Sequence, residues 1–184
     1  MYKRQGFLKA ARQHAEKVIA AVNDLDPAGL MPVIGVEPSE IYTLKDEYPD
    51  FFPGEAFVES LADRAFMLDE FLLRAGKAGK PRILRIDIAP GGQDPTKNSV
   101  FLHGHCYQKS QPPAVDGFPV GLHATQELLE QVGYRVELIE AGCCGMAGSF
   151  GYELEHYDLS MKIGELALFP VSYTHLTLPT TPYV

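Results

Sequence analysis

The residues whose chemistry stands out are the three cysteines of this 184-residue chain, because thiolates bind soft metals and act as nucleophiles. Cys143 and Cys144 are adjacent within the glycine-rich run 140–151, and thirty-six residues separate Cys143 from Cys106. Adjacent cysteines make a poor structural disulfide, because so small a ring strains the preferred geometry. Thiolate ligands select zinc, Cu(I) or iron–sulfur clusters over magnesium and calcium. The pattern predicts a soft-metal site, in first place an iron–sulfur cluster, if the fold brings the two distant loops together.

Glycines and histidines accompany the cysteines. Gly142 and Gly145 flank the cysteine pair. They would let the backbone approach a bulky inorganic group and present N–H groups to its sulfides. His103 and His105 occupy alternate positions before Cys106, so they share a face if the segment is extended. We expect them to support the site around the ligands, or else to form hydrogen bonds in the interior.

Composition narrows the class of protein. A formal net charge of −8 argues against a nucleic-acid surface, which needs clustered Lys and Arg. A hydrophobic content of 46% suits a soluble globular chain, and no stretch has the length of apolar sequence that crosses a bilayer. The N-terminus lacks a secretory signal pattern, and three cysteines are too few for a disulfide scaffold. The expectation is a cytoplasmic protein with no transmembrane segment.

Hydrophobic periodicity predicts strands that alternate with helices. The expected helices cover 6–22, a segment that starts at Pro38, 57–74 (the longest), 122–132 and 153–168. The expected strands cover 32–36, 100–106 and 136–139, with one further strand or hairpin within 82–98. This order predicts an α/β fold, with a mostly parallel sheet and helices on both faces.

Three of these strands have cysteines or glutamates at or after their carboxyl ends, which is where ligands bind in open parallel sheets. Cys106 closes one strand and Cys143 follows the next, while Glu37 to Glu40 follow the strand near Val33. The three ends are therefore expected to face one crevice. The carboxylate of Glu40 would either ligate iron or cap the helix that begins there, and the cap is the favoured reading.

The motifs carry a resemblance to a known family. The runs concerned are HGHCYQK at 103–109 and GCCGMAGSFGYE at 142–153, followed by His156-Tyr157 and Ser160-Met161. They resemble the cysteine-rich CCG domain family, which includes a subunit of heterodisulfide reductase and the iron–sulfur subunit of glycolate oxidase. The C-terminal iron–sulfur region of large FAD-linked oxidases of the D-lactate dehydrogenase type is the most similar, because it also resembles the segments 8–12, 35–39 and 43–47.

The resemblance covers nearly all of residues 6–170 and implies two CCG-type repeats. Residues 6–80 would be the remainder of the first repeat, and 81–170 the second repeat without its last cysteine motif. Residues 1–5 and 171–184 resemble translated sequencing-adapter sequence, so both repeats would be truncated and both ends non-native. A genuine flexible tail is the alternative for the C-terminal segment.

The resemblance also implies a function. Cys106, Cys143 and Cys144 would be thiolate ligands of a 4Fe–4S cluster that passes electrons, and no catalytic residue would lie in this chain. The electrons would come from an FAD domain upstream in the parent chain, which oxidises a 2-hydroxy acid such as D-lactate or glycolate. They would go to a downstream acceptor such as a quinone or cytochrome. The parent complex would then set any membrane association, and the isolated fragment would be inactive.

Two other functions fit the same cysteines. A zinc-binding structural domain would use the thiolates in a closed tetrahedral site. A thiol-disulfide redox protein would use Cys143 or Cys144 as a nucleophile of low pKa, although the C-x-x-C spacing of such proteins is absent.

Overall fold

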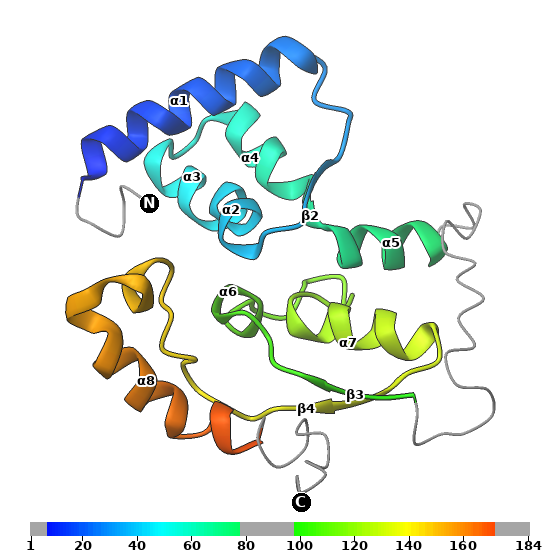
Figure 1. The fold of residues 1–184 in the computed structure, drawn as a ribbon. Coiled ribbons are helices and arrows are strands. Elements are labelled where there is room, and N and C mark those ends of the chain that lie inside the picture. The colour runs from blue at the N-terminus through cyan, green and yellow to red at the C-terminus, as the bar shows by residue number, and fades with distance from the viewer. Residues whose placement is uncertain (1–6, 78–97, 172–184) are drawn as a thin grey trace, which may run out of the picture. The chain divides into compact units, whose positions relative to one another are not determined.

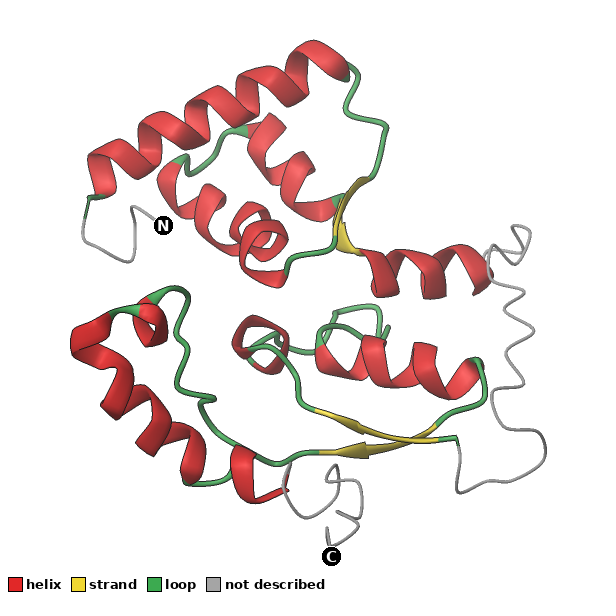
Figure 2. Ribbon diagram, in the orientation of Figure 1, coloured by secondary structure: helices red, strands yellow, loops and turns green. Residues whose placement is uncertain are grey.

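A computed structural model describes residues 7–77 and 98–171, which form two compact units. The first unit contains 7–77 and 110–128, and the second contains 98–109 and 129–171. Helices predominate in both units, and the strands are short and parallel (Figures 1 and 2). The broad α/β expectation is confirmed. A sheet covered on both faces and a division into CCG-type repeats stay predictions.

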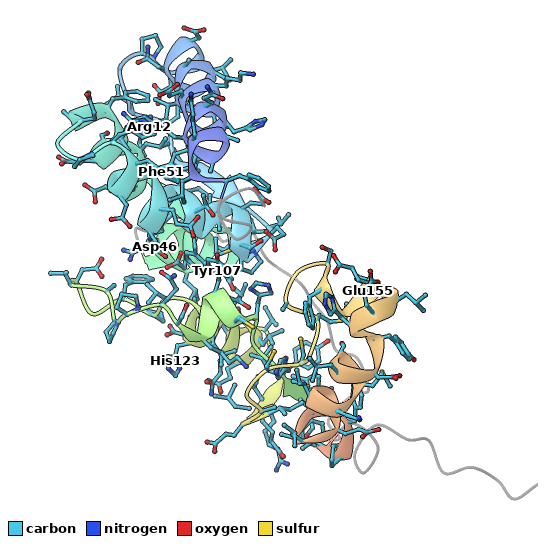
Figure 3. All side chains as sticks on the ribbon, turned by 90° about the vertical axis from the view of Figure 1, so that its left-hand side faces the viewer. Arg12, Asp46, Phe51, Tyr107, His123 and Glu155 are labelled. Atoms are coloured by element: carbon cyan, nitrogen blue, oxygen red, sulfur yellow. The ribbon has the colours of Figure 1, made fainter. Side chains whose placement is uncertain are left out.

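The first unit opens with α1 (Leu8–Leu25), which confirms the helix expected over 6–22. Its buried position is Ala15, which is 1% exposed. The guanidinium of Arg12 lies over the ring of Phe52, 4.8 Å from the ring centroid. Figure 3 labels Arg12 on α1 and, next to Phe52 in sequence, Phe51 on α3 (Tyr48–Phe51). Contacts of this kind place α1 against the segment that follows α3.

The strand expected over 32–36 is β1 (Val33–Gly35), and the helix expected at Pro38 is α2 (Pro38–Tyr42). The turn between them is tight, because a Cβ at Gly35 would lie 2.7 Å from the Cβ of Ile41. A π-helical turn, Thr43–Glu47, leads on to α3. β1 pairs in parallel with β2 (Ala65–Met67).

The cap of α2 is Glu37, so the expectation that Glu40 caps this helix is wrong. The Glu37 carboxylate accepts a hydrogen bond of 2.8 Å from the Glu40 N–H and one of 2.6 Å from the Ser39 hydroxyl. An acceptor for the N–H of Glu40 comes from the residue that precedes the helix, since the first N–H groups point backwards along the axis. Glu40 itself is the third residue of the helix, within its first turn, and its N–H is the group that is capped.

The single long helix expected over 57–74 is also wrong. The structure has α4 (Ala56–Asp63), then β2, then α5 (Leu68–Lys77), and α1 is longer than either helix. Arg64 ends α4, and its carbonyl oxygen accepts a 2.8 Å hydrogen bond from Val33 of β1. The Arg64 guanidinium also donates to Asp26, at 2.8 Å. Pairing with a distant strand replaces the helical hydrogen bonds that local periodicity favours.

Glu70 of α5 is a buried carboxylate, 0% exposed. One of its oxygens, Oε2, accepts a 3.1 Å hydrogen bond from the Met67 N–H, whereas Oε1 has no hydrogen-bond partner among the described residues. Burial raises the pKa of Glu70, and the charge of Lys45 only partly opposes the rise. The carboxyl group of Glu70 therefore binds its proton more tightly in the folded chain than in the unfolded chain.

We expect this carboxyl to make the stability of the chain depend on pH. The folded-state pKa of Glu70 lies above its unfolded value of about 4.3, so its contribution is fully present below that pH. The free energy of unfolding should fall as pH rises through the folded-state pKa. Glu70→Gln should flatten this part of the profile and stabilise the chain near pH 8 by about 1 kcal/mol.

Urea unfolding followed by circular dichroism, between about pH 4.5 and pH 8, measures this effect. Glu59→Gln is the matched control, because Glu59 lies exposed on the neighbouring helix α4. Parallel profiles for the wild type and Glu70→Gln would contradict the prediction.

The second unit contains β3 (Ser99–Leu102) and β4 (Arg135–Leu138), which pair in parallel. Its other elements are α6 (Cys106–Lys109), the last part of α7 (Leu122–Gln131), short 3-10 turns at Phe150–Tyr152 and Leu154–His156, and α8 (Tyr157–Glu165). The strand expected over 100–106 is shorter than predicted, since a helical turn begins at Cys106. The last helix likewise starts at Tyr157 rather than at Glu153.

Other expectations fall outside the described residues. Most of the strand or hairpin expected within 82–98 lies there, as do residues 1–5 and 172–184. No helix in the described part of the chain is long and apolar enough to span a bilayer.

Candidate metal centre

The loops that carry the cysteines leave the same edge of one sheet. β3 and β4 are parallel, with Leu102 opposite Leu138, and the N–H of Ile139 donates a 2.9 Å hydrogen bond to the Leu102 carbonyl. The carboxyl ends of parallel neighbours lie at a common edge. Cys106 follows the end of β3 and Cys143 follows the end of β4, so the sheet brings the two cysteine segments to one side (Figure 1).

The third strand end expected at this crevice belongs to a different sheet. β1 pairs with β2 in a two-stranded sheet of the first unit, so the expectation of three strand ends in one sheet is wrong. β1 finds its parallel partner in a strand that the sequence pattern assigned to a helix. Glu40 is exposed in that first unit. Burial raises the pKa of the Tyr48 hydroxyl there, and the charge of Glu40 adds to the rise.

Cys106 is held at the first residue of α6 by a reciprocal cap. The Gln108 side-chain oxygen accepts a 3.1 Å hydrogen bond from the N–H of His105, while Nδ1 of His105 accepts a 3.2 Å bond from the N–H of Tyr107. The His105 and Tyr107 rings also stack, with centroids 5.9 Å apart (Tyr107 is labelled in Figure 3). This arrangement is a capping box with histidine at its first position. His105 thus supports the turn of Cys106, with Nδ1 occupied by the cap.

Lys109 connects the turn of Cys106 to the loop of the cysteine pair. Its ammonium donates hydrogen bonds of 2.9 Å to the Ala141 carbonyl and 2.7 Å to the Gly142 carbonyl. The same nitrogen lies 3.4 Å from Nε2 of His103. Because an ammonium has no acceptor, a hydrogen bond in this contact requires Nε2 of His103 to be without a proton. Burial lowers the pKa of His103, and the charge of Lys109 lowers it further.

Packing against α8 determines the path of the loop after the cysteine pair. Gly145 has φ +90°, and a Cβ there would overlap the carbonyl oxygen of Ser160, a buried residue of α8. A Cβ at Gly151 would lie 2.5 Å from the Ser160 hydroxyl. Gly142 differs, since a Cβ there would meet no atom within 4 Å. Glycine is therefore required at 145 and 151 by the protein's own packing, and at 142 it leaves open space.

The three thiols are free and accessible. Cys106 and Cys143 are exposed, and Cys144 is partly buried. The Gly145 N–H donates to the sulfur of Cys143 at 3.3 Å, as a loop that surrounds a thiolate is expected to do. In the residues that the structure describes, no group of three or more His, Cys, Asp or Glu already stands ready to hold a metal ion. Three thiols are suitable ligands for a soft metal group. Because they are not already assembled around one point, binding of that group must draw them together.

Three residues of the site were not assigned a role from sequence: Gln108, Lys109 and Ser160. A signal was present for each, since all three lie within the runs that carry the family resemblance. The roles of Lys109 and Ser160 depend on hydrogen bonds and packing between segments that are distant in sequence, whereas the Gln108 side chain bonds locally to the N–H of His105. The assigned roles of Gly142 and Gly145 toward a cofactor, and of the cysteines as ligands, stay predictions.

Comparisons with known proteins find relatives at low identity over most of the chain. It is 26% identical over 166 residues to D-2-hydroxyglutarate dehydrogenase of Pantoea ananatis, covering 90% of this chain and 14% of that protein. It is 27% identical over 163 residues to D-2-hydroxyglutarate dehydrogenase of Escherichia coli K12, covering 89% and 14%. It is also 26% identical over 160 residues to one of the subunits of anaerobic glycerol-3-phosphate dehydrogenase of Escherichia coli K12, covering 86% and 36%.

No family model and no solved structure matches the chain. The chain spans about one seventh of the length of the D-2-hydroxyglutarate dehydrogenases and about a third of the glycerol-3-phosphate dehydrogenase subunit. Its similarity is thus to one region of larger dehydrogenase proteins, in two kinds of enzyme that are named for different substrates.

Proposed function

We propose that this chain is the iron–sulfur electron-transfer region of an FAD-linked dehydrogenase that acts on a 2-hydroxy acid. Cys106, Cys143 and Cys144 would hold the cluster, which when bound supplies reversible storage of single electrons. A flavin domain elsewhere in the parent protein would deliver electrons, and a downstream carrier such as a quinone or cytochrome would accept them. Oxidation of the substrate itself would occur outside this segment.

The relatives support a shared electron-transfer role. The same region is similar to parts of proteins named for D-2-hydroxyglutarate and for glycerol-3-phosphate. Enzymes with different substrates are expected to share the segment that performs a common step, and to differ in the segments that recognise the substrate. Electron transfer away from the oxidised substrate is such a step, and cysteine ligands are the groups that it requires.

One structural observation carries the proposal. The segments of Cys106 and Cys143 leave neighbouring parallel strands at one edge, and Lys109 joins them through the Ala141 and Gly142 carbonyls. Cys106 and Cys143 are exposed and Cys144 is partly buried, and on these joined loops the three thiols would bind a common inorganic group. Because the chain has three cysteines, a 4Fe–4S cluster would leave one iron for a ligand other than a cysteine of this chain.

Anaerobic reconstitution of the full chain with iron and sulfide tests this function. We expect bound iron and sulfide with broad visible absorbance in the wild type, and loss of both in the Cys143→Ser, Cys144→Ser double variant. Ser149→Ala is the control, because Ser149 is exposed in the same loop and should leave cluster content unchanged.

Two outcomes would overturn the proposal. A colourless chain with stoichiometric zinc, lost in the double variant, would identify a structural zinc site. A chain that binds no metal but has one rapidly alkylated thiol would identify a thiol redox protein.

A further inference from the structure

The side chain of Lys109 joins the turn of Cys106 to the loop of the cysteine pair within the second unit. We infer that Lys109 is a positioning residue: it clamps the loop of Cys143 and Cys144 to the turn of Cys106, and it supplies positive charge beside the thiolates. The clamp follows from the geometry. The effect of the charge on a cluster rests on the proposed function.

The hydrogen bonds of Lys109 converge on the residues just before the cysteine pair. Its ammonium is 2.9 Å from the Ala141 oxygen and 2.7 Å from the Gly142 oxygen, and the Lys109 backbone N–H closes the α6 turn by bonding to His105 at 3.0 Å. Bonds from a charged donor are stronger than neutral ones. Lys109 is therefore fixed at its backbone to one cysteine segment and at its side chain to the other.

The charge of Lys109 is not cancelled by an acid. Its partners are two carbonyl groups and the His103 ring, whose pKa is lowered, and the ion pairs seen in the described residues do not include Lys109. An unpaired cation favours whichever state of its neighbours carries more negative charge. Next to thiolate ligands it should therefore favour the reduced state and raise the reduction potential.

Amide hydrogen exchange in the full chain, without added metal, tests the clamp. Lys109→Met should accelerate exchange at Ala141 and Gly145 by about tenfold or more, because two charge-assisted bonds are lost. The amides of β4 should keep their rates. Lys109→Arg, which retains the charge and several donors, should preserve protection in the loop.

Lys162→Met is the matched control, since Lys162 is exposed on α8 of the same unit. Equal loop exchange in Lys109→Met and Lys162→Met would overturn the clamp. If Lys109→Met also exposes β4, Lys109→Gln takes its place, because it removes the charge but keeps an N–H donor. Unchanged amide exchange of the loop in Lys109→Gln would show that the clamp does not need the charge of Lys109.

The reduction potential of the reconstituted chain tests the charge. Lys109→Met should shift the potential to a more negative value than that of Lys162→Met, whereas Lys109→Arg should keep the wild-type value. An unchanged reduction potential in Lys109→Met would overturn the electrostatic role. The clamp would then be judged by the amide exchange measurement alone. If the wild type takes up no cluster, the proposed function fails together with the electrostatic role, while the exchange measurement still decides the clamp.

Discussion

Gly145→Ala is expected to destabilise the second unit by about 2–4 kcal/mol and to abolish any metal binding by the cysteine pair. Two effects add. The residue has φ +90°, which disfavours a side chain, and its Cβ would overlap the backbone of Ser160 in α8. The loop must move to relieve the overlap, and the Gly145 N–H would then lose its 3.3 Å contact with the Cys143 sulfur.

Two glycine variants separate these effects. Gly133→Ala, at φ +99° with nothing within 4 Å of the added Cβ, carries strain without overlap and should cost about 1 kcal/mol. Gly142→Ala meets no atom within 4 Å and should change stability by less than about 0.5 kcal/mol. Urea unfolding of the three variants gives the order, and a cost for Gly145→Ala no larger than that for Gly133→Ala would show that packing on α8 is unimportant.

Leu61→Ala is expected to lower the free energy of unfolding of the first unit by about 3 kcal/mol. Leu61 of α4 is 0% exposed, among the largest fully buried side chains described. Its truncation removes apolar contacts and leaves a cavity, since a packed interior relaxes only in part. Thermal or urea unfolding measures the loss, and the cysteine loop of the second unit should keep its amide exchange rates.

The control for this change is Leu25→Ala at the end of α1, where the leucine is 79% exposed. The same chemical truncation should there cost less than about 0.5 kcal/mol. Equal effects of the two leucine variants would mean that Leu61 does not belong to a packed core.

Hydrophobic periodicity predicts an element well where residue spacing and the flanking turns define it. α1 and α7 were predicted near their observed bounds, because their apolar residues repeat at helical spacing and no breaker interrupts them. β1 and β4 were also predicted, as short apolar runs bounded by turns. It failed at Ala65–Met67, where helical spacing continues but the segment pairs with β1. Hydrogen bonds between distant strands decided that case, and no local pattern contains them.

By itself, the sequence determined which residues could do chemistry: Cys106, Cys143 and Cys144, with glycines on both sides of the pair. It also determined the order of most helices and strands, since both follow from residue type and spacing. Only the tertiary structure decided that β1 belongs to another sheet than β3, and that Lys109 joins the two cysteine segments. Each of these depends on where backbone donors and acceptors meet in space, and that is fixed only when the whole chain packs.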